Sequence, residues 1–190
     1  MRYRGTDPLV LAIPRGGVPI GRVLADRLDG DLDLVLVRRL GSPFNPAHSI
    51  GAVDESGSFA LSGSSDLAWM TRERLEREKS VQLASMRAER RRWSLGRPPL
   101  SRAGRTVIVV DDALASGATM GAALRLLAGQ GARRVICAVP IASRLGMDSV
   151  RALADECEAL AMLEPFGPIA RYYGELPPIE DEELTQLLAA

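Results

Sequence analysis

The fold is decided by residues 106–119, which read Thr106-Val107-Ile108-Val109-Val110-Asp111-Asp112-Ala113-Leu114-Ala115-Ser116-Gly117-Ala118-Thr119. The first five residues are apolar or β-branched without alternation, which is typical of a strand buried on both faces of a parallel sheet. Two carboxylates, Asp111 and Asp112, follow at the carboxyl end of this strand, where open α/β sheets bind their ligands. We therefore expect an α/β fold with a ligand site directly after this strand.

The segment after the acidic pair has the composition of an anion-binding loop. Its small side chains let backbone N–H groups approach an anion, and a helix expected near residue 120 adds the positive end of its dipole. Carboxylates accept hydrogen bonds from a vicinal diol, so the whole segment suits a ribose phosphate. In this interpretation the phosphate contacts Ala113, Leu114, Ala115, Ser116, Gly117, Ala118 and Thr119. The alternative is that the two acids cap a helix and the small residues form a tight turn.

Strand-like and helix-like stretches alternate on both sides of this segment. Short apolar runs predict strands over residues 9–13, 34–37, 106–110, 135–139 and 159–163. Helix-like stretches cover residues 18–28 and 120–127, and a further helix starts near Ser143 or Met147. This alternation predicts a doubly wound, mainly parallel five-stranded sheet with right-handed crossovers.

A long insertion, residues 41–104, separates the second and third expected strands. Residues 50–53 and 59–61 flank a Glu-Ser-Gly turn and are expected to pair as a hairpin. Residues 66–93 read as a long charged helix whose loose apolar face includes Val81, and residues 96–101 as a linker. Four arginines near the end of that helix suggest RNA binding, but neighbouring glutamates offset them and favour a solvated or dimer-facing helix.

The composition bounds the class of protein. The 190 residues suit one domain over residues 1–190, and 24 basic residues balance 24 acidic ones, which disfavours a nucleic-acid or membrane partner. No apolar run approaches the ~20 residues that a bilayer span needs. We expect a cytoplasmic protein in which Cys137 and Cys157 are reduced thiols in the core.

Residues 106–119 resemble the phosphoribosyl pyrophosphate signature of the type I phosphoribosyltransferases. The resemblance extends from the first strand to about residue 163, and is nearest to a small bacterial group known only as predicted phosphoribosyltransferases. It implies that Asp111 and Asp112 hold the ribose hydroxyls, and touch Mg²⁺ mostly through substrate or water. It implies transfer of a phosphoribosyl group to a nitrogen acceptor, with a nucleobase as the expected class, and release of pyrophosphate. A non-catalytic sensor of phosphoribosyl pyrophosphate is the alternative, and hydrolysis of a phosphorylated sugar is a weaker one.

The segment Ile13-Pro14-Arg15-Gly16-Gly17 is a second candidate site. Arg15 supplies a fixed positive charge, and Gly16 and Gly17 expose backbone N–H groups, a combination that suits pyrophosphate. The resemblance implies that this loop binds the leaving group, often through an unusual peptide conformation. An ordinary strand-to-helix turn with a surface arginine is the alternative.

The resemblance also implies a mobile loop after Arg38 and Arg39, through Ser49, and an acceptor hood over residues 164–190. Either arginine is expected to reach pyrophosphate oxygens, and Arg39 is counted with Asp111, Asp112 and Arg15 as catalytic. His48, in that loop, has no partner in the sequence that would orient it. Phe166, Tyr172 and Tyr173 are the hood candidates; they either stack on the acceptor or pack the carboxyl-terminal tail. The segment before the first strand is short and lacks a helix that relatives often have there. The sequence therefore does not decide whether the hood is complete or whether the expected homodimer forms.

Overall fold

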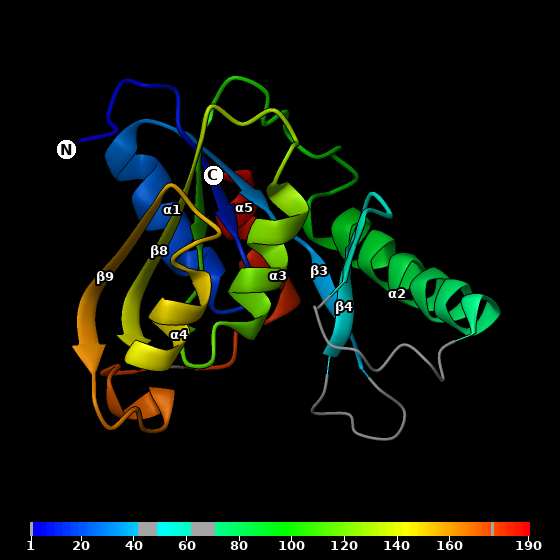
Figure 1. Ribbon diagram of the computed structural model, residues 1–190. Helices are drawn as coiled ribbons and strands as arrows, with labels where there is room; N and C mark the ends of the chain where they lie inside the picture. Colours follow the sequence, from blue (N-terminus) through cyan, green and yellow to red (C-terminus); the bar gives the residue numbers. More distant parts are fainter. Residues whose placement is uncertain (1, 42–48, 62–70, 176) are drawn as a thin grey trace.

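The computed structural model describes residues 2–41, 49–61, 71–175 and 177–190. Its centre is a parallel sheet whose five main strands lie in the order β2 (Asp31–Leu34), β1 (Leu9–Ala12), β6 (Thr106–Val110), β8 (Arg134–Ser143) and β9 (Glu156–Leu163) (Figure 1). The two-residue strand β7 (Ala113–Leu114) also pairs with β8. The predicted five-stranded parallel sheet is confirmed.

The central strands are buried on both faces, which explains their continuous apolar sequence. Every residue of β1 and β6 is buried. Alternate side chains point to opposite faces of the sheet, so Val10 and Ile108 pack with α1 (Gly17–Leu28), while Leu11 and Val109 pack with α3 (Ala118–Leu127) and α4 (Arg144–Val150). The helix expected from Ser143 begins there, with Ser143 as its N-cap. The sheet is therefore doubly wound.

The bounds predicted for the second core strand, residues 34–37, are wrong. β2 ends at Leu34, and β3 (Val37–Gly41) begins in a separate antiparallel sheet. The amide of Val35 still donates to Ala12 O at 3.0 Å, after which the chain leaves the parallel sheet. All residues from Leu34 to Val37 are buried, so the apolar run continues across the break and hides it. Consequently Arg38 and Arg39 lie within β3 and not at the end of a core strand.

The second sheet contains β3, β4 (Ser49–Asp54) and β5 (Phe59–Leu61), and its last two strands are the predicted hairpin. One face packs on α2 (Arg72–Trp93) through Val53 and Met86, and the other face packs on α3. Val81 is 57% exposed, so it does not belong to the apolar face of α2 as predicted. The predicted start of this helix, residues 66–70, lies outside the described residues.

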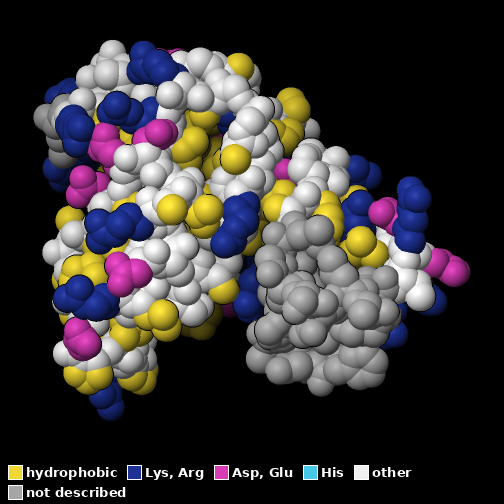
Figure 2. Space-filling model, in the orientation of Figure 1, with side chains coloured by type: hydrophobic (Ala, Val, Ile, Leu, Met, Phe, Trp, Pro, Cys, Tyr) yellow, Lys and Arg dark blue, Asp and Glu magenta, His cyan; other side chains and the backbone are white. Residues whose placement is uncertain are grey.

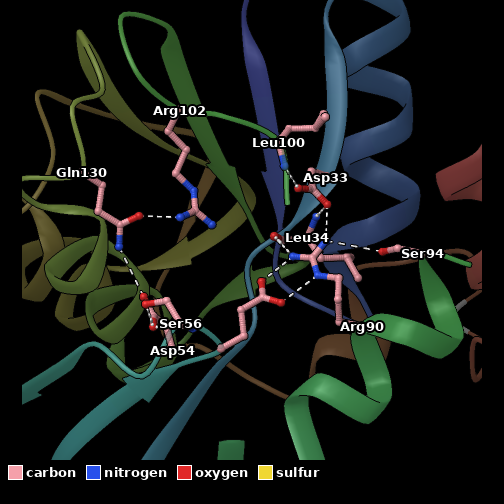
Figure 3. Close-up of polar contacts among 10 residues, drawn as sticks. Asp33, Leu34, Asp54, Ser56, Arg90, Ser94, Leu100, Arg102 and Gln130 are labelled. Atoms are coloured by element: carbon pink, nitrogen blue, oxygen red, sulfur yellow. Dashed lines mark hydrogen bonds and ion pairs between the residues drawn. The ribbon is translucent and has the colours of Figure 1, made fainter. Parts of the chain in front are cut away.

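Arg90 ties α2 to both sheets (Figure 3). Its buried guanidinium pairs with Asp33 of β2 and with Glu55 of the hairpin turn, and it donates to Leu34 O at 2.8 Å. One of the four clustered arginines is thus a structural residue and is not available to an external partner. On the face shown in Figure 2, basic and acidic side chains are interspersed.

The chain after β9 returns across the sheet to its amino-terminal helix. A short 3-10 turn (Ile169–Arg171) precedes α5 (Asp181–Ala189), which packs against α1 and α2 on the side of the sheet opposite α3 and α4 (Figure 1). Leu184 and Leu188 are the buried residues of α5. Among the described segments, no helix combines the length and apolar character required to cross a bilayer.

Candidate functional site

The loops after β1 and β6 contact each other at the carboxyl edge of the sheet. The two strands are paired in register, Ala12 beside Val110, and the amide of Ile13 donates to Val110 O at 2.8 Å. A Cβ atom on Gly16 would lie 2.0 Å from Asp112 Oδ2, and one on Gly17 would lie 2.6 Å from Val110 O. A Cβ at Gly17 would clash with the backbone of β6 and the acidic pair, and one at Gly16 would displace the Asp112 side chain, so the first candidate loop packs directly on the acidic pair.

The acidic pair is partly buried and electrostatically costly. Burial, with the adjacent charge of Asp112 as the second cause, raises the pKa of Asp111 to about 7. Burial also raises the pKa of Asp112. The amide of Asp112 donates to Asp111 Oδ1 at 2.9 Å, which partly stabilises the negative charge. A cluster of this kind, at a ligand-binding edge, is typical of a functional site.

The raised pKa predicts how Asp111 affects stability. The unfolded carboxyl titrates near 4, so its stabilising contribution is complete below pH 4 and is lost as pH rises through about 7. Asp111→Asn should therefore raise the melting temperature more at pH 8 than at pH 5, by roughly 5–10 °C for a chain of this size. Thermal unfolding followed by circular dichroism at both pH values measures this difference. An equal shift at the two values would contradict the assigned cause.

The loop after the acidic pair presents free backbone donors. The amides of Ser116, Gly117 and Thr119 donate to no acceptor within the described residues, and that of Ala118 has only a long 3.4 Å contact to Ser116 Oγ. These amides surround the N-terminus of α3, where the helix dipole is positive. Unsatisfied N–H groups at a helix N-terminus suit a phosphate.

Residues of β8 and α4 hold this loop from behind. Ser143 Oγ donates to Ala115 O, and Ser149 Oγ donates to Ser116 O at 3.2 Å. Gly117 has φ +72° and lies so close to α4 that a Cβ would be 2.0 Å from Ser149 Oγ. These hydrogen bonds from Ser143 and Ser149 cannot be predicted from local sequence, because the loop lies about 30 positions earlier in the chain.

Arg15 is held by the carboxyl-terminal segment. Its guanidinium pairs with Asp181 at 2.8 Å, donates to Ile179 O at 2.8 Å, and lies 5.1 Å from the centre of the Trp93 ring. Trp93 Nε1 also donates to Asp181, and this hydrogen bond is the largest cause of a lowered Asp181 pKa. The peptide bond between Pro14 and Arg15 is cis. No local pattern predicts Asp181 as a partner of this loop, because it lies 166 positions after Arg15 in the sequence.

The structure separates the two arginines of β3. Arg38 forms a bidentate pair with Glu89 of α2, with contacts of 2.6 and 2.7 Å. Side chains alternate along a strand, so Arg39 lies on the other face, the one that packs on α3, and its side chain is exposed. Of the two arginines, Arg38 has a carboxylate partner, and Arg39 has none among the described residues. Arg39 lies on the α3 side of the small sheet. His48 lies outside the described residues.

One of the three hood aromatics reaches the acidic pair. Tyr173 Oη donates to the carbonyl oxygen of Asp112 at 2.6 Å. Tyr172 instead contacts Phe166, at 6.0 Å between ring centres, and its hydroxyl accepts from the amide of Gly167 at 2.9 Å. Phe166 and Tyr172 thus order their own turn, while Tyr173 borders the site.

The acidic pair suits a cation that is bound mainly by substrate and water. In the described ranges, no group of three or more His, Cys, Asp or Glu side chains could form a protein cage for a metal. Two adjacent carboxylates provide the hard oxygen ligands that Mg²⁺ accepts while keeping several waters.

Cys137 and Cys157 are free and lie side by side in β8 and β9; burial raises the pKa of Cys137 to about 12. Burial also raises the pKa of Cys157, and a raised pKa disfavours the reactive thiolate in both residues.

Similarity to known proteins points to one family. Residues 1–166 match the family described as "Phosphoribosyl transferase domain". Two Mycobacterium tuberculosis proteins, from strains CDC 1551 and H37Rv, carry the provisional name phosphoribosyl transferase and are 35% identical over 192 residues. The alignment covers 97% of this chain and 42% of theirs, so the chain spans less than half the length of these curated relatives.

Solved structures agree with this match. The crystal structure of the protein TT1426 from Thermus thermophilus is 40% identical and superposes with a TM-score of 0.86, covering 96% of this chain and 86% of that one. A hypoxanthine phosphoribosyltransferase from Staphylococcus aureus has a similar fold, with a TM-score of 0.50 at 12% identity over 86% of this chain and 66% of that one. From its sequence match and its fold, the chain belongs to the phosphoribosyltransferase family.

Proposed function

We propose that this domain binds 5-phosphoribosyl 1-pyrophosphate with Mg²⁺ and transfers the phosphoribosyl group to a nitrogen acceptor, releasing pyrophosphate. The observation that carries the proposal is the set of amides of Ser116, Gly117 and Thr119, which lack acceptors among the described residues, in the loop that follows the carboxylates of Asp111 and Asp112. The carboxylates suit the ribose 2′- and 3′-hydroxyls, and the amides suit the 5′-phosphate. A ribose phosphate presents these two groups at its opposite ends.

The leaving group is assigned to the first loop. Gly16 lies next to Asp112, and its amide has no acceptor among the described residues, whereas the Gly17 amide already donates to Ile13 O at 3.0 Å. The expectation that both glycines expose free N–H groups is therefore wrong for Gly17. Arg15, which is paired with Asp181 in this structure, adds the positive charge of this loop. Arg39 is the further candidate, because Arg38 is already paired with Glu89. Mg²⁺, when bound, supplies charge neutralisation at the ribose hydroxyls and the pyrophosphate.

The reaction exchanges two bonds at the anomeric carbon. The bond to the pyrophosphate oxygen breaks with its electron pair on that oxygen, a bond to the acceptor nitrogen forms, and the proton of that nitrogen passes to the released pyrophosphate or to water. The domain contributes by positioning the donor and stabilising the departing charge, as preorganised donors do in other enzymes. We assign Tyr173, of the three hood aromatics, to the acceptor side, and its hydrogen bond to Asp112 O supports this assignment.

The role of Arg15 predicts an unequal effect on two ligands. Arg15→Ala should weaken binding of phosphoribosyl pyrophosphate about tenfold, and binding of ribose 5-phosphate less than twofold, because only the donor carries the group that Arg15 would contact. Isothermal titration calorimetry in the presence of Mg²⁺ measures the affinities for phosphoribosyl pyrophosphate and for ribose 5-phosphate. Asp181→Asn is the control: it removes the partner of Arg15 and keeps the guanidinium. Equal weakening of the two ligands by Arg15→Ala would exclude Arg15 from the pyrophosphate site.

Turnover separates the transferase from its alternatives. Wild-type protein with the donor and Mg²⁺ should release pyrophosphate only when an acceptor from a panel of purines, pyrimidines and amines is added. Donor binding without release for any acceptor, together with salt-sensitive binding of RNA or DNA, would support the sensor instead. Pyrophosphate release without an acceptor would support hydrolysis.

A further inference from the structure

A cavity of about 300 Å³ lies between the two sheets and α2. Its walls come from the β2–β3 connection, the hairpin turn after β4, the last turns of α2, the linker to β6 and the end of α3. In Figure 3, Arg102 and Gln130 lie on one side of this region, and Arg90 lies on the other. Asp54 and Ser56 lie between them, lower in the view. Such a volume is at the lower end of the range for small-molecule sites.

The acidic side chains of this cavity are already neutralised or hydrogen-bonded. Asp54 is buried, and its Oδ1 accepts from the amides of Ser56 and Ser58 at 2.9 and 3.0 Å. Gln130 donates to its Oδ2 at 3.3 Å. Glu55 accepts two hydrogen bonds from Arg90. Neither carboxylate is therefore available to attract a cation.

The remaining arginines of the lining lack carboxylate partners. Arg87 and Arg91 form no ion pair in the described part of the chain, and Arg97 donates only to the backbone carbonyls of Ser94 and Leu188. Arg102 donates to the neutral Gln130, and its Nε is buried without any partner among the described residues. Because Arg90 is paired with both Asp33 and Glu55, the positive charge of the lining is carried by Arg87, Arg91, Arg97 and Arg102, against the single hydrogen-bonded carboxylate of Asp54. This cavity attracts anions.

The other walls are apolar. Val35, Leu36, Leu126 and Leu127 are all buried, and two prolines of the linker complete the lining. Bidentate arginine recognition suits phosphate groups, while apolar walls suit a flat organic body. From this combination we propose that the cavity is a second ligand site, which binds an organic polyphosphate of the nucleoside diphosphate class.

This site is separate from the proposed donor site. α3 begins at the phosphate loop, at Ala118, and its other end supplies Leu126 and Leu127 to the cavity. A helix of ten residues is about 15 Å long. A ligand in the cavity therefore contacts the opposite end of the helix whose N-terminus borders the acidic pair.

The proposal is tested by titrating ADP into the protein without Mg²⁺ and following binding by calorimetry. Wild type should bind with a Kd below about 1 mM, and Arg87→Gln with Arg91→Gln should weaken binding at least tenfold. Arg72→Gln with Arg74→Gln is the matched control: these residues are exposed on the same helix but lie outside the cavity lining. This control should change the affinity less than twofold. Arg102→Gln should also weaken binding at least tenfold.

Three ligands distinguish the chemistry. ADP should bind at least threefold more tightly than inorganic tripolyphosphate, because the apolar walls contact the base, and at least tenfold more tightly than adenosine. Wild-type affinity in the Arg87→Gln, Arg91→Gln variant would overturn the proposal, since ADP would then occupy another site. So would an equal loss in the control variant, which would indicate a response to overall charge. Equal binding of tripolyphosphate and ADP would overturn the assignment of an organic ligand.

Discussion

Replacement of both Asp111 and Asp112 by asparagine is expected to weaken binding of phosphoribosyl pyrophosphate in the presence of Mg²⁺ at least 100-fold. Each carboxylate would accept charge-assisted hydrogen bonds from the ribose diol, which are worth about 1.5–3 kcal/mol. The substitution also removes both negative charges that favour the cation. A 100-fold loss corresponds to about 2.7 kcal/mol, within what two such contacts supply.

The same variant is expected to fold normally. Burial raises the pKa values of both carboxyls, so their charge costs stability at pH 8, and neutral amides relieve that cost. Calorimetry measures donor affinity, and thermal unfolding checks the fold. Asp26→Asn with Asp29→Asn is the matched control, because both residues are exposed at the C-terminal end of α1, whose opposite end borders the first loop. Wild-type donor affinity in the Asp111→Asn, Asp112→Asn variant would reject the site assignment.

Gly16→Ala is expected to weaken donor binding by a similar factor, at least 100-fold, although it adds one methyl group. The backbone of Gly16 has φ −59°, which alanine adopts without strain. The effect is therefore steric: the added Cβ would lie 2.0 Å from Asp112 Oδ2 and 2.5 Å from its Cγ. The carboxylate must move out of its position beside the first loop, and the loops that would bind the two ends of the donor separate.

The control for this prediction is Gly174→Ala. A Cβ at Gly174 meets nothing within 4 Å, so the substitution tests the general effect of adding a methyl group in the hood segment. Calorimetric affinity for the donor should match wild type within twofold in this control. If Gly16→Ala also retained wild-type affinity, Asp112 would have room to move without loss, and the close approach of the two loops would not matter for binding.

Much of the fold is visible in the sequence because its signals are local. β1 and β6 are buried on both faces, so their apolar runs are continuous and bounded by charged or turn residues. The Ser-Gly-Ala-Thr start of α3 and the N-cap Ser143 of α4 are likewise local patterns. The break between β2 and β3 is not visible, because residues buried between two different sheets have the same apolar character as residues of one strand.

The candidate site divides in the same way. The sequence by itself determined the acidic pair, the small-residue loop and the two glycines, since each is a short pattern whose chemistry is carried by neighbouring residues. Only the tertiary structure decided that Gly16 packs directly against Asp112. It also decided two ion pairs, Arg15 with Asp181 and Arg38 with Glu89. These contacts join residues between about 50 and 165 positions apart. Their existence depends on how strands pair and helices pack, which no local pattern encodes.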